Sequence, residues 1–190
     1  PPTEGTVTIG RQSLQKISFK EWRKHCGVVM QEGFIFGDTI ANNIVPDGNM
    51  IDKKRLLYAV EMANIRDFVE SLPPKYNTRI GNTGQGLSQG QKQRILIARA
   101  IYRNPDYLFF DEATNALDTD NEKVIQGNQE KFFKDKTVVI VAHRLSTVKN
   151  ADQIVVLKEG EITEKGTHDE LITRQGDYYR LVKNQLELSA

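Results

Sequence analysis

The sequence lacks most of the features that mark secreted, membrane-spanning or nucleic-acid-binding chains. One cysteine, Cys26, occurs among 190 residues, so no internal disulfide can form, which is typical of a reducing compartment. No apolar run approaches the roughly 20 residues of a membrane span, and no signal peptide is recognisable. The 26 Lys and Arg residues are balanced by 25 Asp and Glu residues, and the net charge of +1 gives no reason to expect a nucleic-acid partner. The length suits one domain with a sizeable core. The chain opens with Pro1-Pro2 rather than Met, and we expect it to be a piece of a longer polypeptide.

The most informative stretch runs from Tyr107 to Asp118, Tyr-Leu-Phe-Phe-Asp-Glu-Ala-Thr-Asn-Ala-Leu-Asp. A short apolar run without alternation is typical of a strand buried on both faces in a parallel sheet. Ligands bind outside the carboxyl ends of such strands, where Asp111 and Glu112 would lie. Because an unpaired carboxylate is costly to bury, the pair indicates a cation, a water molecule or a ligand. In the Walker B arrangement the Asp holds the Mg²⁺ of a nucleotide, and the next Glu can activate a water. A core strand ending in a solvated acidic turn is an equally good interpretation of these residues alone.

Two other apolar runs end in polar side chains. Residues 27–30 predict a strand that ends at Gln31, and residues 137–142 predict another doubly buried strand that ends at His143. A lone Gln is more often a surface residue, and a lone His is usually structural. Three strands that each end in a polar group are harder to dismiss than one, so the sequence favours a site at this edge of the sheet.

Helix-start signals mark a second candidate site. Ser88 and Gln91 predict a capping box, and the start of a helix presents free amides and a positive dipole end that suit phosphate. Gly90 has no Cβ to block close approach. An ordinary capped helix remains the alternative. Upstream, Asp52 is the predicted N-cap of one helix and residues 65–72 form another, which together indicate an inserted helical lobe.

Two further segments complete the pattern. In the loop of residues 32–37, two glycines flank Phe34, Ile35 and Phe36, which either dock on a partner or pack into the chain's own core. Near the C-terminal end, residues 154–157 and 161–165 predict a hairpin, followed by helices around residues 169–173 and 178–188.

The order of these motifs resembles that of the ATP-binding-cassette (ABC) transporter ATPases. Four segments carry the resemblance: Val29 to Gln31 is similar to the Q-loop, Leu87 to Gln91 to the signature motif, Tyr107 to Asp118 to the Walker B strand with its D-loop, and Val141 to Thr147 to the switch-histidine segment. Four motifs in one order are far more specific than any one of them. They look most like the exporter branch, and the stretch around the signature is most similar to peptidase-containing bacteriocin or peptide exporters.

The resemblance implies an α/β fold of the P-loop NTPase type, with a parallel sheet flanked by helices and an inserted helical lobe. Residues 1–190 would form part of a nucleotide-binding domain, with about 45–100 as the helical subdomain that carries the signature and the remainder as a RecA-like core. ATP and Mg²⁺ are the implied ligands. The implied activity is ATP hydrolysis that powers export of a peptide or similar substrate at the cytoplasmic face of a bacterial plasma membrane.

Residue roles follow from the same resemblance. Asp111 and Gln31 would bind Mg²⁺, partly through water, Glu112 would polarise the attacking water, and His143 would contact the γ-phosphate. The signature residues would bind the nucleotide held by the opposite subunit of a head-to-tail dimer: Ser88, Gln89, Gly90 and Gln91. Asp118 would couple the two sites of that dimer, and Phe34, Ile35 and Phe36 would receive the coupling helix of a transmembrane domain.

The sequence departs from the family pattern at three points. Gln89 stands where Gly is usual and Asn115 where Ser is usual, and neither change removes a group that the chemistry needs. No Gly is followed by Lys, so the Walker A motif Gly-x-x-x-x-Gly-Lys-Ser/Thr does not occur. We therefore expect a chain without the first strand, the P-loop and its helix, inactive alone and with part of its core uncovered. A non-hydrolysing cassette that acts as a dimerisation or interaction module is the alternative, and a soluble ABC protein without a transport role is a third.

Overall fold

The computed structural model describes residues 2–45, 50–81, 84, 86–111, 119–142 and 148–188. The chain divides into two compact units, Pro1–Val139 and Ile140–Ala190, which are described separately below. Across the described ranges, no helix is both long enough and apolar enough to cross a lipid bilayer.

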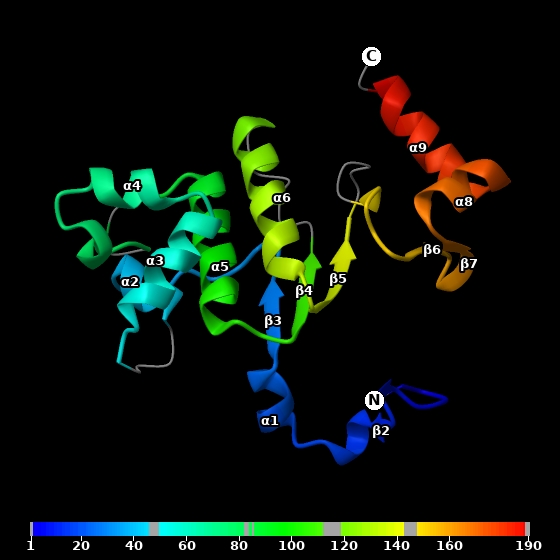
Figure 1. The fold of residues 1–190 in the computed structure, drawn as a ribbon, viewed down its shortest axis with the longest axis horizontal. Coiled ribbons are helices and arrows are strands. Elements are labelled where there is room, and N and C mark those ends of the chain that lie inside the picture. Colours follow the sequence, from blue (N-terminus) through cyan, green and yellow to red (C-terminus); the bar gives the residue numbers. More distant parts are fainter. Residues whose placement is uncertain are drawn as a thin grey trace. The chain divides into compact units, whose positions relative to one another are not determined.

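A small parallel sheet forms the centre of the first unit. It consists of β3 (Cys26–Val29), β4 (Tyr107–Asp111) and β5 (Thr137–Val141), with β4 in the middle. The three arrows point the same way in Figure 1. β3 and β4 pair in parallel with Val28 opposite Phe109 and Val29 opposite Phe110, so both strands reach their carboxyl ends at the same level.

One face of the sheet is covered by helices. α5 (Gln89–Arg103) packs against β3, and α6 (Thr119–Phe133) brings the ring of Phe133 within 5.3 Å of the ring of Phe110. Leu108 and Phe110 are buried on this face, as the alternation of a strand requires.

The other face of the sheet is largely open, so the prediction of strands buried on both faces is wrong. Val28, Val139 and Val141 are 58%, 48% and 53% exposed, and Tyr107 and Phe109 of β4 are only half-buried. An apolar run allows a strand to be buried on both faces. Whether the second face is actually buried depends on helices or strands from other parts of the polypeptide that pack against it.

Three helices and a 3₁₀ turn lie between β3 and α5: α2 (Ile40–Ile44), α3 (Lys53–Met62), α4 (Arg66–Ser71) and the short turn η2 (Lys75–Asn77). α3 begins directly after the predicted N-cap Asp52, and α4 lies within the predicted range 65–72. The Asp52 carboxylate accepts the amides of Lys54 and Arg55, which confirms it as an N-cap. α3 and α5 pack against each other, with buried side chains such as Leu56 and Ile97. Figure 1 shows these helices grouped together in cyan and green.

The N-terminal segment begins with a short hairpin, in which β1 (Thr8–Ile9) pairs with β2 (Gln12–Ser13). A 3₁₀ turn, η1 (Leu14–Lys16), and helix α1 (Phe19–Lys24) follow. α1 is tied to the sheet by Trp22, whose ring lies 4.7 Å from that of Tyr107.

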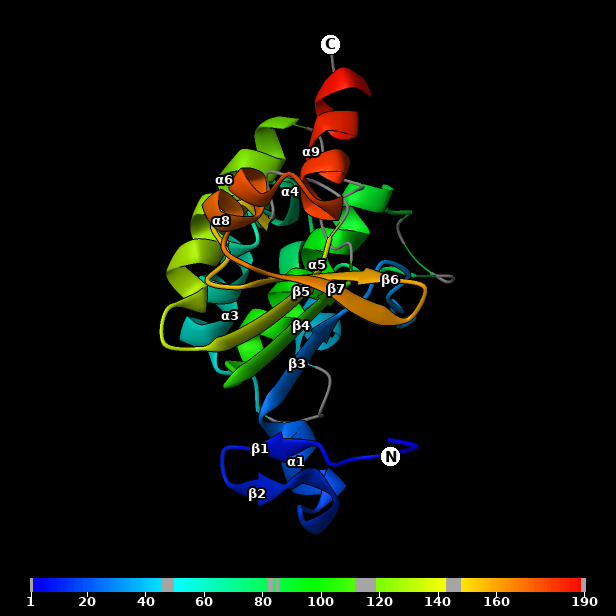
Figure 2. The same cartoon turned by 90° about the vertical axis from the view of Figure 1, so that its right-hand side faces the viewer.

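The second unit contains the predicted hairpin and two terminal helices (Figure 2). β6 (Ile154–Lys158) pairs antiparallel with β7 (Glu161–Gly166), and α8 (His168–Arg174) and α9 (Asp177–Leu188) follow. Its core is a cluster of five buried side chains: Ile154, Val156, Leu171, Tyr178 and Val182. The α9 helix is capped from the hairpin, because the Glu164 carboxylate of β7 accepts the Tyr178 amide at 2.6 Å.

Candidate functional site

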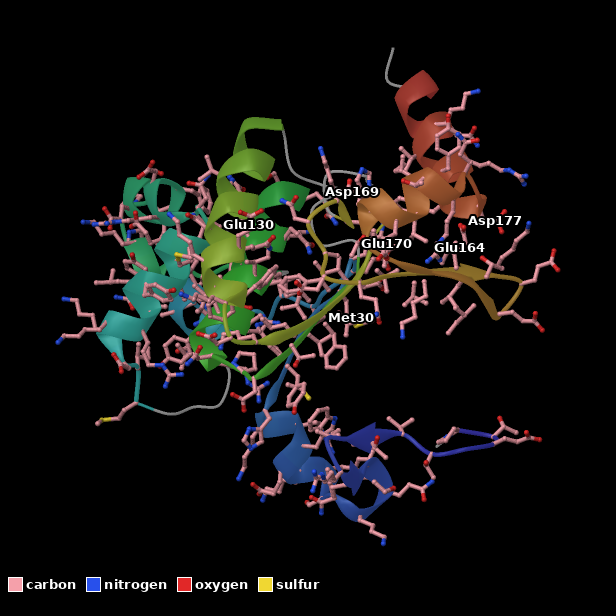
Figure 3. All side chains as sticks on the ribbon, turned by 45° about the vertical axis from the view of Figure 1, so that its right-hand side comes forward. Met30, Glu130, Glu164, Asp169, Glu170 and Asp177 are labelled. Atoms are coloured by element: carbon pink, nitrogen blue, oxygen red, sulfur yellow. The ribbon has the colours of Figure 1, made fainter. Side chains whose placement is uncertain are left out.

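The carboxyl edge of the sheet carries Asp111, the last residue of β4, and Gln31, two residues after the end of β3. Because Val29 lies opposite Phe110, Asp111 and the Met30-Gln31 pair follow directly at the same edge; Met30 is labelled in Figure 3. Both Gln31 and Asp111 are exposed. The expectation of a buried carboxylate that needs a counterion is therefore wrong for Asp111, because this residue is exposed. An amide oxygen and a carboxylate at one edge of the sheet are oxygen donors of the hard kind that Mg²⁺ prefers.

Three predicted site residues lie outside the described residues. These are Glu112 and Asp118, which follow β4, and His143, which follows β5. Their roles stay predictions. Within the described ranges, no group of three or more His, Cys, Asp or Glu side chains is arranged to hold a metal ion.

The capping box at the start of α5 is confirmed. Ser88 Oγ accepts the Gln91 amide at 3.2 Å, and the Ser88 amide donates to Gln91 Oε1 at 2.9 Å. The amides of Gln89 and Gly90 come before the first intrahelical hydrogen bonds, as in any helix start, so they are available to an acceptor outside the helix. Ser88 and Gln89 are exposed, and Gly90 and Gln91 are half-buried.

This helix start is electrically unlike that of α8. Thr167 and Glu170 form the same kind of box at the start of α8, whose first turn carries Asp169 and Glu170 (Figure 3). The first turn of α5 carries no acidic residue. The positive end of the α5 dipole is therefore not compensated by its own first turn, which suits an incoming anion.

The two phenylalanines of the loop between β3 and α2 face solvent. Phe34 is 66% exposed and Phe36 is 44% exposed, with their rings in an edge-to-face contact at 5.1 Å, while Ile35 is half-buried. The alternative that all three pack into the core is wrong for both phenylalanines. Their docking role stays a prediction.

Sequence reasoning missed Asn43 and Arg99, which hold this loop. Asn43 is fully buried, and its side chain accepts the Phe36 amide at 2.8 Å and donates to the Phe36 carbonyl at 3.0 Å. Arg99 of α5 donates from Nε to the Asn43 carbonyl at 2.7 Å and from Nη1 to the Phe34 carbonyl at 2.9 Å. A polar residue inside the apolar run Ile-Ala-Asn-Asn-Ile is a weak signal for Asn43, whereas nothing local marks Arg99.

Comparison with known proteins decides the family. A family model described as "ABC transporter" matches residues 1–115. The chain belongs to the ABC transporter family. It is 45% identical over 184 residues to mouse ATP-binding cassette sub-family B member 5, and 42% identical over 185 residues to the ATP-dependent lipid A-core flippase of Syntrophus aciditrophicus.

Its fold is that of an ABC exporter's nucleotide-binding domain. A solved structure of a bacterial Atm1-family ABC exporter with ATP bound matches 97% of the chain with a TM-score of 0.90 and 38% sequence identity. The chain spans 15% of the mouse protein, 31% of the flippase and 32% of the Atm1-family chain.

Proposed function

We propose that this chain is part of the nucleotide-binding domain of an ABC exporter, and that the complete domain binds and hydrolyses ATP together with a second nucleotide-binding domain, whereas this chain alone, without Walker A, is inactive. The observation that supports this best is the register of β3 and β4, which brings Gln31 and Asp111 to one edge of the sheet. The uncompensated start of α5 at Ser88 adds a phosphate-binding element of the kind that the family uses.

Each site residue has a role in this proposal. Asp111 and Gln31 would hold Mg²⁺, partly through water, and a bound Mg²⁺ would supply charge stabilisation for phosphoryl transfer. Glu112 orients and polarises the attacking water, and His143 donates to the γ-phosphate. Positioning and charge stabilisation do most of the catalysis in such a reaction.

The second nucleotide-binding domain completes the site. Ser88 Oγ, Gln91 and the free amides of Gln89 and Gly90 bind the γ-phosphate of the nucleotide held by the opposite domain. Asp118 couples the two sites, and the residues 34–36 receive a helix of the transmembrane domain. The chain would then lie at the cytoplasmic face of a membrane.

The cargo is a separate question. The sequence around the signature predicts a peptide or bacteriocin. Two relatives are named for other cargoes, the lipid A-core flippase and multidrug resistance protein 3 of Entamoeba histolytica, and these names favour a lipid-like or amphipathic cargo instead. Uptake of a labelled peptide or a labelled lipid into inside-out vesicles would decide between them.

The test uses the polypeptide encoded by the complete gene. Asp111→Asn is expected to lower Mg²⁺-dependent ATP turnover by about 100-fold, the usual loss when one charge-stabilising group is removed. Glu112→Gln is expected to trap ATP and abolish turnover. Asp106→Asn is the matched control: this carboxylate precedes β4, and its contact with His25 Nδ1 at 2.7 Å is exposed to solvent and contributes little.

The opposite result supports the non-hydrolysing interaction module. If neither Asp111→Asn nor Glu112→Gln changes turnover or ATP retention, the hydrolytic function is wrong. The surface that pairs with a second nucleotide-binding domain would then serve only to bind that partner, without hydrolysis.

A further inference from the structure

The loop of residues 31–38, called the aromatic loop from here on, lies along one face of α5 together with Met30. Three residues of α5 spaced three apart contact this segment, and side chains at this spacing share a helix face. Gln93 Nε2 makes a long hydrogen bond of 3.5 Å to the Met30 carbonyl. Gly33 lies so close to Leu96 that an added Cβ would overlap Leu96 Cδ1. Arg99 Nη1 donates to the Phe34 carbonyl at 2.9 Å.

Arg99 makes the strongest of these contacts. Its guanidinium donates to the Phe34 carbonyl, to the Asn43 carbonyl at 2.7 Å and to Asn43 Oδ1 at 3.2 Å. It also lies over the Phe36 ring, 5.1 Å from the ring centre. One side chain therefore contacts the backbone of Phe34, the helix α2 that follows the loop, and the ring of Phe36.

Asn43 adds hydrogen bonds to the backbone of Phe36. Its side chain pairs with both the amide and the carbonyl of that residue, and Nδ2 also donates to the Thr39 carbonyl at 3.0 Å. A buried amide with its hydrogen bonds satisfied fixes a unique arrangement, because any displacement would leave buried polar groups unpaired.

The chemistry of Arg99 fits a positioning role. All three acceptors of its hydrogen bonds are uncharged oxygens. Burial lowers the pKa of the Arg99 guanidinium, but an arginine keeps its charge in proteins. A planar fork can hold several acceptors at once, which a lysine ammonium on a flexible chain cannot reproduce.

We propose that Arg99 is a positioning residue that holds the aromatic loop on α5, so that a partner pressing on Phe34 and Phe36 moves the start of the helix at Ser88 with them. This inference rests on the proposed function, in which the loop receives a transmembrane-domain helix and Ser88 faces the nucleotide. Arg99 lies about 16 Å along the helix axis from Ser88, and a packed helix transmits displacement over that distance as a rigid element.

The first test is amide hydrogen exchange on the complete protein. Arg99→Gln is expected to speed exchange of the amides in residues 34–43 by about 10- to 100-fold, because hydrogen bonds to a charged group are lost. Arg99→Lys is expected to restore part of the protection, since one donor remains. Exchange in α3 and in the first half of α5 is expected to stay unchanged.

Arg55→Lys is the matched control for this test. Arg55 also donates to a backbone carbonyl of α5, that of Tyr102 at 2.6 Å, and also lies over an aromatic ring, that of Tyr102 at 4.9 Å. Neither contact involves the aromatic loop. Unchanged exchange in residues 34–43 of Arg99→Gln would overturn the proposal, and so would an equal rise throughout α3 and α5, because Arg99 would then only stabilise the fold.

The second test is a double-mutant cycle on ATP turnover. Arg99→Gln is expected to lower kcat by between about 10- and 100-fold with little change in KM for ATP, since a small misplacement of a catalytic element has this effect. In a Phe36→Ala background the same change is expected to cost little more, because Arg99 acts through the loop. If the fold-losses in kcat of Arg99→Gln and Phe36→Ala instead multiply in the double variant, the proposal is overturned. If the wild-type protein hydrolyses no ATP, the proposed function fails, and the exchange result alone decides whether Arg99 positions the loop.

Discussion

Replacing Gly33 by alanine tests how tightly the aromatic loop packs on α5. A Cβ added at Gly33 would overlap Leu96 Cδ1 and would lie 2.9 Å from Cδ2 and 3.1 Å from Cγ. Leu96 is only 6% exposed, so its side chain has little room to turn away. Gly33 does not have a positive φ, so the effect of the new methyl group is steric and not a matter of backbone strain.

The size of the effect follows from packing. Inserting a methyl group into a filled contact costs about 1–3 kcal/mol. Leu96→Ala alone is expected to cost about 2–5 kcal/mol, because it leaves a cavity. In the double variant the methyl group added by Gly33→Ala enters the space that the leucine vacates, so the two changes together are expected to cost less than their sum by about 0.5–3 kcal/mol.

Amide hydrogen exchange measures these values as free energies of local opening for the loop and α5. Gly86→Ala is the control, because a Cβ there meets nothing within 4 Å. The reasoning is refuted if Gly33→Ala leaves exchange unchanged, or if it costs as much in the Leu96→Ala background as in the wild-type protein.

Three further predictions concern capping and burial. Glu164→Ala is expected to destabilise α9 locally by about 1–2 kcal/mol, because the Tyr178 amide loses its acceptor, and Glu164→Gln by less; exchange of the α9 amides measures both. Burial raises the pKa of the Cys26 thiol, so native protein is expected to react far more slowly with iodoacetamide than unfolded protein. The folded state favours the protonated Cys26 thiol. The contribution of this thiol to folding stability is therefore complete below the ordinary thiol pKa of about 8.5, and it falls as the pH rises through the raised pKa of the folded state. Unfolding measured at alkaline pH would detect this loss. Asp52→Ala is expected to weaken α3 by about 1 kcal/mol, with Asp52→Asn close to wild type, as read from amide exchange in that helix.

Features set by neighbouring residues could be predicted from the sequence. The Ser88–Gln91 box and the Asp52 cap each depend on side chains within three positions of one another, and the structure has both. The hairpin of β6 and β7 is equally local, since a two-residue turn joins its strands. Parallel pairing of β3 with β4 was implied by the family resemblance, because the two strands lie far apart in the chain.

Features that depend on distant residues could not be predicted. Arg99 and Asn43 are 56 positions apart, and each looks like an ordinary polar residue of its own helix. Uncovered core was expected from the missing Walker A segment, but its location on β5 could not be predicted, because Val139 and Val141 fit a buried strand as well as an exposed one. Of the predicted catalytic groups, Glu112 and His143 lie outside the described residues, so their placement stays a prediction.

If the start of α5 binds a nucleotide as proposed, its neutral capping box implies a compromise between stability and activity. Gln91 occupies the position that Glu170 fills in the otherwise similar box of α8. A glutamate at position 91 would favour the positive helix end by about 0.3–1 kcal/mol. The same negative charge would repel a phosphate approaching Ser88. Under the proposed function, Gln91→Glu would therefore raise the midpoint of unfolding and weaken binding of ATP. The start of α5 would then be less stable than it could be because a polyanion has to bind there.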